Sequence, residues 1–250
     1  MRRQLTPEEL AYVRPIFGTS IDYSRVRITR DHPMSIGAPK VVGCTVHLRS
    51  RWGIDQFERR ASGAWSTELT EAGRRTLVHE LTHVWQYQNG GLAYIPDSLM
   101  AQLKATLRHG SRSGAYVWRH AHRLQLPWAR WNPEQQATLV EDYNSLVQAL
   151  KSAKARGYRP LPDDTELVRT ARPYLDELER RQGAPTWRMV HGAAALTGAA
   201  LGALAAWPLG SIAAAAAALV GALLIGHQLG VGGGLGIGRG RDLVGHRVGQ

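Results

Sequence analysis

The sequence changes character at Trp187, and this break limits how much of the chain can form a globular core. Before it, polar and apolar residues are mixed as in a soluble domain, over a length sufficient to bury a core. After it come two runs of about eighteen residues made mostly of Ala, Gly, Leu and Val, at 189–206 and 212–229. The break predicts three parts: a domain over residues 1–183, a helical hairpin over 187–235 and a basic glycine-rich tail over 236–250.

The first part carries the signals of an α+β fold, mostly helical with a small sheet. Thr6-Pro7 and Asn132-Pro133 each pair a helix-capping residue with a proline in the first turn. Loose alternation of apolar residues indicates strands. Residues 109–131, rich in Arg, His and aromatics, give no clear pattern. We expect strands at about 21–29 and 41–48, and helices at about 6–17, 70–89, 96–107, 132–155 and 164–181.

The expected helix at 70–89 contains the run His79-Glu80-Leu81-Thr82-His83. Residues four apart lie one turn apart on the same face of a helix, so His79 and His83 can present two imidazoles to a single ion. Glu80 lies about 100 degrees around the helix, close enough to accept a proton from a water molecule at that ion. This spacing is typical of zinc peptidases. The alternative is a helix whose two histidines only line a core.

Catalytic zinc requires a third protein ligand. The residues after His83 lack the glycine and third histidine of the metzincins, and Cys44 is the chain's single cysteine, which excludes a cysteine-rich site. The third ligand should therefore be a carboxylate on a later helix. Glu134, in the first turn of the helix that begins after Asn132, is the leading candidate. Glu141 and Asp142 are the alternatives, and Glu141 shares a helix face with Glu134, so one could bind the metal while the other orients a histidine.

These segments resemble a known family. The run His79-Glu-Leu-Thr-His-Val-Trp-Gln-Tyr-Gln88, followed by Asn132-Pro-Glu-Gln-Gln-Ala137 and Val140-Glu-Asp-Tyr143, is similar to small bacterial HExxH metallopeptidases found near Rhs and Vgr elements. Those proteins are related to the HExxH domain of contractile-injection-system cargo proteins. The openings Leu5-Thr-Pro-Glu-Glu and Phe17-Gly-Thr-Ser-Ile-Asp-Tyr23 also match, so the resemblance covers about residues 4 to 150.

The resemblance implies a zincin-like fold, a peptide or protein substrate and possible secretion-system partners. It assigns Zn²⁺ to His79, His83 and Glu134, and it assigns the role of general base to Glu80. One position departs from the pattern: related zincins often carry an aspartate four residues after the ligand glutamate, where this chain has Thr138. Unless Asp142 replaces it, the histidine-orienting role of that aspartate is unfilled.

Several other side chains are candidates for roles around such a site. A zincin usually needs a hydrogen-bond donor for the oxyanion of its tetrahedral intermediate. The sequence offers, without ranking them, Tyr116, Tyr143, His120 and His122. Four tryptophans are expected to fill the core or an interface rather than form a binding surface, namely Trp85, Trp118, Trp128 and Trp131.

The apolar part after Trp187 predicts a membrane hairpin. Each run lies near the lower length limit for spanning a bilayer, and the pairs Gly198/Gly202 and Gly226/Gly230 would let two helices approach closely. Basic residues on both outer flanks favour a catalytic domain that faces the cytoplasm. A toxin delivered into another cell's membrane would show the same pattern, and a helical pair packed on the domain or a disordered end are further alternatives.

Charge and termini restrict the remaining function classes. The formal net charge of +11 favours acidic partners, although an arginine-rich proteome gives the same excess. No ribbon of aromatic and basic residues appears, so nucleic acid is not an expected partner, and nucleic-acid binding through the basic surface stays as a second alternative function. Residues 1–10 lack the apolar core of a cleavable signal peptide. The alternative to an enzyme is a membrane-associated structural or delivery module that keeps a zincin fold without catalysis.

Overall fold

The computed structural model describes residues 2–32, 39–49, 56–157, 159 and 162–186. By its internal contacts the chain divides into a unit of residues 1–193 and a second unit of residues 194–250. The predicted hairpin over 187–235 and the tail over 236–250 lie outside the described residues. Within the described part of the chain, no helix combines the length and the apolar character needed to cross a bilayer.

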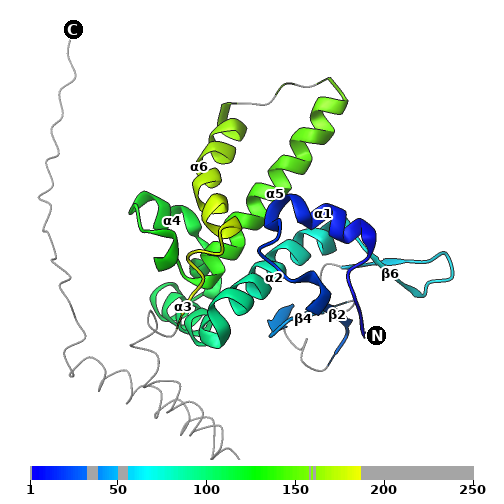
Figure 1. Cartoon of the computed structure of the whole chain (residues 1–250), viewed down its shortest axis with the longest axis horizontal. Coiled ribbons are helices and arrows are strands. Elements are labelled where there is room, and N and C mark those ends of the chain that lie inside the picture. Colours follow the sequence, from blue (N-terminus) through cyan, green and yellow to red (C-terminus); the bar gives the residue numbers. More distant parts are fainter. Residues whose placement is uncertain (1, 33–38, 50–55, 158, 160–161, 187–250) are drawn as a thin grey trace, which may run out of the picture. The chain divides into compact units, whose positions relative to one another are not determined.

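The described residues form an α+β structure in which helices predominate, as expected (Figure 1). The helices are α1 (Pro7–Phe17), α2 (Glu71–Gly90), α3 (Tyr94–His109), α4 (Trp118–Arg123), α5 (Pro133–Ala155) and α6 (Pro162–Glu179). Single 3₁₀ turns lie at η1 (Tyr23–Arg25), η3 (Gly91–Ala93), η4 (Arg112–Tyr116) and η5 (Trp128–Arg130). The strands are β1 (Arg2–Arg3), β2 (Arg27–Arg30), β3 (Lys40–Val42), β4 (Thr45–Leu48), β5 (Phe57–Arg59) and β6 (Trp65–Leu69).

The strands form two small sheets. In the first, the order is β1-β2-β4-β3, with β2 and β4 parallel and the outer pairs antiparallel. The second is the antiparallel hairpin of β5 and β6. This hairpin leads into α2. Gly73, in the first turn of α2, allows the backbone at Gln56, just before β5, to lie close to the helix. A Cβ atom at Gly73 would lie 2.0 Å from the backbone oxygen of Gln56.

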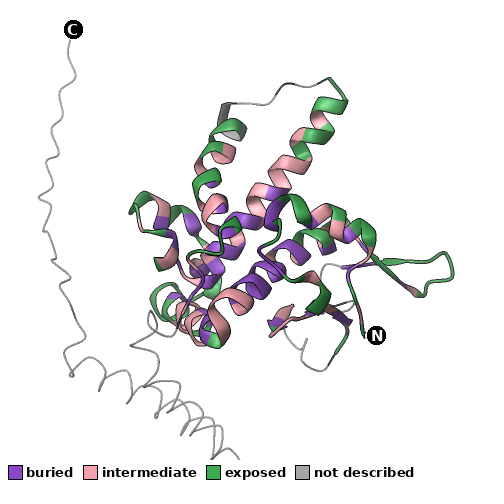
Figure 2. Ribbon diagram, in the orientation of Figure 1, coloured by how far each residue is buried: buried purple, intermediate pink, exposed green. Residues whose placement is uncertain are grey.

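The helices α2 and α5 pack against each other at the centre of the structure and carry the predicted metal-binding residues. Figure 2 shows buried residues running along α2 and over the first turns of α5. Leu77, Leu81 and Val84 are fully buried on α2, as their helical spacing predicts. The indole of Trp85 donates a hydrogen bond of 3.0 Å to the carbonyl of Leu178, which ties α2 to the end of α6.

The four tryptophans are all buried, which confirms their predicted place in the core. The ring centroid of Trp131 lies 6.3 Å from that of Trp118 and 5.4 Å from that of Trp128. Tyr174 from α6 packs on the same cluster. This cluster fills the space between α4, η5 and α6. It therefore serves packing rather than ligand binding.

Two local expectations were wrong, and one hairpin was not predicted. Residues 21–29 do not form one strand, because the side chain of Asp22 caps the turn η1 by accepting a hydrogen bond from the backbone N–H of Ser24. Residues 41–48 form two antiparallel strands, because Gly43 adopts a φ of 61° and reverses the chain. Cys44 accordingly lies in that turn and is half-buried. Finally, the polar segment before α2 contains the hairpin of β5 and β6.

Candidate metal centre

The three predicted ligands come together between α2 and α5. One carboxylate oxygen of Glu134 lies 3.3 Å from Nε2 of His79 and 3.6 Å from Nε2 of His83. These residues form the one group of histidine, cysteine and acidic side chains in the described part of the chain whose ligand atoms all lie close enough for a metal ion, within 4.8 Å of one another. Two imidazoles and a carboxylate, joined from two helices, form a metal-binding arrangement of the kind the sequence predicts.

The opposite ring nitrogen of each histidine is already engaged. Nδ1 of His79 lies 3.2 Å from a carboxylate oxygen of Glu141, and Nδ1 of His83 lies 2.8 Å from the side-chain oxygen of Gln86. Both partners are acceptors, so each Nδ1 carries the proton and donates it. Each Nε2 faces the carboxylate of Glu134, where a proton or a metal ion can lie between the nitrogen and the oxygen. This arrangement fixes the tautomer and the ring orientation that a metal ligand needs.

Gln86 belongs to a buried chain of amide groups. Its side-chain nitrogen donates to the carbonyl of Pro133 and to the side-chain oxygen of Gln136. Gln136 in turn donates to the carbonyls of Trp128 and Gly183. Because both donor positions of the Gln86 amide are used, its oxygen must face His83, and the imidazole is held by residues from α5 and beyond.

The charges of the site favour a cation at its centre. Burial lowers the pKa of His79, but its contacts with Glu134 and Glu141 outweigh burial and raise that pKa to about 10. The pKa of His83 is raised in the same way by the charge of Glu134, against the effect of burial. Burial raises the pKa of Glu134, but the two histidines reverse this and keep the carboxyl group ionised. A proton or a metal ion can supply the positive charge that this site requires.

Helix α3 supports the second oxygen of Glu134. The hydroxyl of Ser98 makes a short hydrogen bond to this oxygen, and the side-chain amide of Gln102 donates to it at 3.0 Å. Ser98 and Gln102 lie four residues apart on one face of α3. Helix α3 thus fixes one oxygen of the carboxylate, and the other oxygen is directed towards the two histidines.

Glu80 is buried beside the predicted ligands and lines the two cavities that open next to them. Its Oε2 atom has no hydrogen-bond partner in the part of the chain that the structure describes. Burial raises the pKa of Glu80, although the nearby histidines oppose the shift. An unpartnered carboxylate oxygen beside a cavity of about 650 Å³ is suited to accept a proton from water or substrate.

Tyr116 is the oxyanion-donor candidate that the structure places at this site. Its ring stacks on His79 at a centroid distance of 6.0 Å, and it lines both cavities with Glu80. The capping side chains of α5 hold it there: Asn132 donates to the carbonyl of Ala115, and Gln135 donates to the carbonyl of Val117. Burial and the charge of Glu134 raise the pKa of Tyr116. Its hydroxyl therefore stays protonated and can donate a hydrogen bond.

The other oxyanion candidates have different surroundings. Tyr143 packs, half-buried, against the hydrophobic core. His122 forms a hydrogen bond of 2.9 Å with the hydroxyl of Tyr174. His120 lines a separate cavity that does not include the predicted ligands.

The two alternative ligands occupy distinct positions on α5. Glu141 contacts Nδ1 of His79 and pairs with Arg75 at 3.2 Å, so it takes the orienting role that was expected of either Glu134 or Glu141. Asp142 instead accepts a hydrogen bond of 2.8 Å from the indole of Trp118. Asp142 therefore does not replace the aspartate that is missing at Thr138. Glu141 instead makes the contact that orients a histidine, at Nδ1 of His79.

Several residues of this site were not predicted from the sequence. Gln86 lies three residues after His83, on the same helix face, and this spacing was a usable signal. Ser98 and Gln102 reach Glu134 from a helix whose position the sequence does not give. Tyr94 stacks on His83 with a ring distance of 5.7 Å, while its hydroxyl donates to the carbonyl of Val41.

Comparison with known proteins relates the chain to a secretion-system component. It is 30% identical over 142 residues to the type VI secretion system spike protein VgrG2b of Pseudomonas aeruginosa. The matched stretch covers 56% of this chain and 13% of that protein. No family model matches the sequence, and no solved structure matches it. The expected link to Vgr proteins is therefore confirmed at the level of this partial similarity.

Proposed function

We propose that this chain is a zinc-dependent peptidase of the zincin type that hydrolyses a peptide bond in a protein substrate. One observation carries the proposal: two imidazole nitrogens and a carboxylate oxygen converge beside a buried, unpartnered glutamate at the wall of an open cavity. The set of two histidines and one glutamate is typical of catalytic zinc, which keeps a further position for water or substrate.

The residues present suit zinc rather than a hard cation. Nitrogen ligands with fixed tautomers favour zinc, whereas Mg²⁺ and Ca²⁺ prefer sites made of oxygen atoms. When bound, zinc would polarise the substrate carbonyl and lower the pKa of water. His79, His83 and Glu134 would hold it, with Glu141, Gln86, Ser98 and Gln102 keeping those three side chains in place.

The remaining chemistry belongs to the protein's own side chains. Glu80 would take a proton from the attacking water, whose oxygen bonds to the carbonyl carbon. Tyr116 would donate a hydrogen bond from its hydroxyl to the oxygen of the tetrahedral intermediate. Glu80 would then pass the proton to the leaving nitrogen as the carbon–nitrogen bond breaks, which produces a carboxylic acid and a free amine.

The similarity to a Vgr spike protein supports a setting in a bacterial secretion system, either as a delivered effector or in association with its components. The matched region is 13% of the relative's length, so this setting is part of the proposal. The membrane hairpin predicted for residues 187–235 would place the enzyme at a bilayer.

The test compares the wild-type protein with Glu80→Gln. Both should bind one zinc ion, because Glu80 is not among the converging ligands. In a bacterial lysate treated with each protein, labelling of new N-termini should detect cleavage by the wild type and a loss of roughly 100-fold or more in the variant. Glu68→Gln, at an exposed position, is the matched control and should cleave normally.

Two results would count against the enzyme. If zinc-loaded wild type produces no new N-termini, the peptidase proposal fails. If Glu80→Gln produces the same N-termini as wild type, cleavage does not use this site. A variant without cleavage that keeps the full biological effect would favour a structural or delivery module.

A further inference from the structure

A third cavity, distinct from the two beside Glu80, lies among α3, η4, α4 and the start of α5. Its volume is about 560 Å³, and four cationic side chains line it: Lys104, Arg108, Arg123 and Arg130. Lys104 and Arg108 lie one turn apart on the same face of α3. Arg123 ends α4, and Arg130 ends η5. Elements that are separate in the sequence thus bring four positive charges to one depression.

Within the described part of the chain, no salt bridge neutralises these charges. None of the four cations makes a salt bridge or a side-chain hydrogen bond to any residue that the structure describes, and all four side chains are exposed. Asp97 is the one acidic residue in the lining. Burial raises the pKa of Asp97, and the nearby Lys104 opposes that shift. The cavity, which we call the basic cavity, therefore attracts anions.

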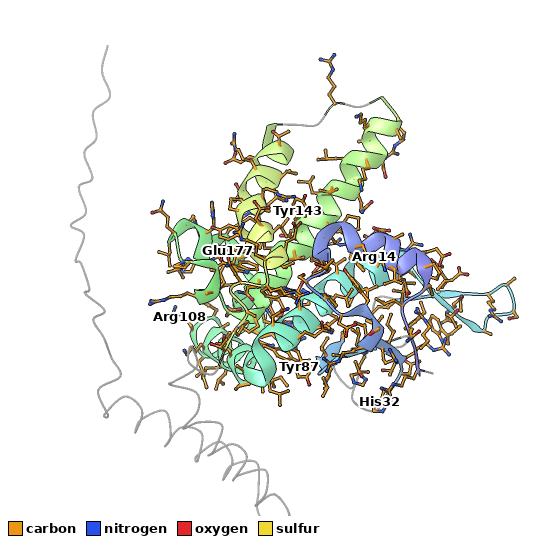
Figure 3. All side chains as sticks on the ribbon, viewed as in Figure 1. Arg14, His32, Tyr87, Arg108, Tyr143 and Glu177 are labelled. Atoms are coloured by element: carbon orange, nitrogen blue, oxygen red, sulfur yellow. The ribbon has the colours of Figure 1, made fainter. Side chains whose placement is uncertain are left out.

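Three exposed apolar residues either line the basic cavity or lie next to one of its cations in the sequence. Val117 lines the basic cavity and is 48% exposed. Leu107, next to Arg108, is 73% exposed, and Leu124, next to Arg123, is 57% exposed. Figure 3 shows the side chain of Arg108 at the edge of the helical region. Single exposed leucines are ordinary, but several beside unpaired cations indicate an interaction surface.

We propose that the basic cavity and these three apolar residues form a docking surface for an anionic lipid bilayer. The cations would bind the phosphate groups of the lipids, and Leu107, Val117 and Leu124 would enter the interface. Basic residues next to a bilayer attract anionic lipids, and apolar side chains beside them add burial. This inference does not depend on catalysis or on the metal.

The lining also argues against nucleic acid as the occupant. Proteins that bind single strands stack bases on aromatic rings, and the lining of the basic cavity contains no Trp, Tyr or Phe. Phosphate contacts to a duplex would leave Leu107 and Leu124 in water. A bilayer satisfies both the charges and the apolar side chains.

The experiment measures partition of the full chain onto vesicles of phosphatidylcholine, with and without phosphatidylglycerol. The predicted hairpin contributes to both measurements, so the ratio of the two partition coefficients isolates the effect of lipid charge. We expect a high ratio for the wild type that decreases as salt screens the charges. Replacing the four cations of the basic cavity by glutamine should lower the ratio roughly tenfold or more.

The matched control removes the same charge elsewhere. It replaces four exposed cations outside the cavity by glutamine: Arg60, Lys151, Lys154 and Arg169. This control should keep most of the wild-type ratio. A third variant, Leu107→Ser with Leu124→Ser, should bind anionic vesicles more weakly, and the remaining binding should depend more steeply on salt. All substituted side chains are exposed, so circular dichroism should show an unchanged fold for every variant.

Four results would overturn the proposal. The four-cation variant could partition like the wild type. The control could also lose as much of the partition ratio as that variant does, which would show that only the net charge of the protein matters. Alternatively, the leucine variant could be unaffected while inorganic pyrophosphate displaces the protein from vesicles, which would indicate a site for soluble phosphates. Retained vesicle binding together with loss of duplex DNA binding in the four-cation variant would assign the surface to nucleic acid.

Discussion

The three acidic residues of α5, Glu134, Glu141 and Asp142, should differ sharply in their effect on zinc affinity. Glu141 contacts Nδ1 of His79 at 3.2 Å, and the loss of such an outer contact typically costs about 10–100-fold in metal affinity, or roughly 1.4–2.7 kcal/mol. Glu141 is 23% exposed and shared with Arg75, so water can take its place. For Glu141→Ala we therefore expect the lower end, about tenfold.

The neighbouring acid provides the control. Asp142→Ala removes an acceptor from the indole of Trp118 and should leave zinc affinity unchanged. Glu134→Gln removes a converging ligand and should lower zinc affinity by more than Glu141→Ala does. Competition with a chromophoric zinc chelator at one pH measures all three variants. If Asp142→Ala weakened zinc binding more than Glu141→Ala, the assignment of roles along α5 would be wrong.

Three further changes test the surroundings of the site. Tyr116→Phe should lower kcat roughly 100–1000-fold without changing zinc affinity, because one oxyanion donor is lost; an unchanged kcat on a cleaved peptide would remove Tyr116 from the mechanism. Gln86→Leu removes the side-chain amide that donates to the buried carbonyl of Pro133, so the unfolding free energy in urea should fall by about 1–3 kcal/mol. Gly73→Ala should destabilise the fold by about 1–3 kcal/mol, since the new Cβ would meet the Gln56 carbonyl; equal thermal midpoints would contradict that.

The ligands were predictable because their geometry is local. The spacing of His79 and His83 places both on one face of any α-helix. Asn132 caps α5 with a reciprocal bond from Gln135, so the position of Glu134 in the first turn followed from the sequence as well. That Glu134 rather than Asp142 meets the histidines depends on how α2 and α5 pack, which helical spacing alone does not decide.

The missed parts of the structure depend on contacts between distant segments. Ser98 and Gln102 reach Glu134 only because α3 folds back over the start of α5. The hairpin of β5 and β6 has few inward apolar residues, among them Phe57 and Leu69, so its alternation is weak. Its identity as a hairpin comes from pairing and from its contact with α2.

X-ray absorption spectroscopy and a crystal structure at the zinc edge would test the central claim most directly. We expect zinc bound to Nε2 of His79 and His83 at roughly 2.0–2.1 Å and to a carboxylate oxygen of Glu134 at roughly 2.0–2.2 Å. Zinc held elsewhere on the chain, or held at this position by Glu141 or Asp142 with Glu134 outside bonding distance, would contradict the account.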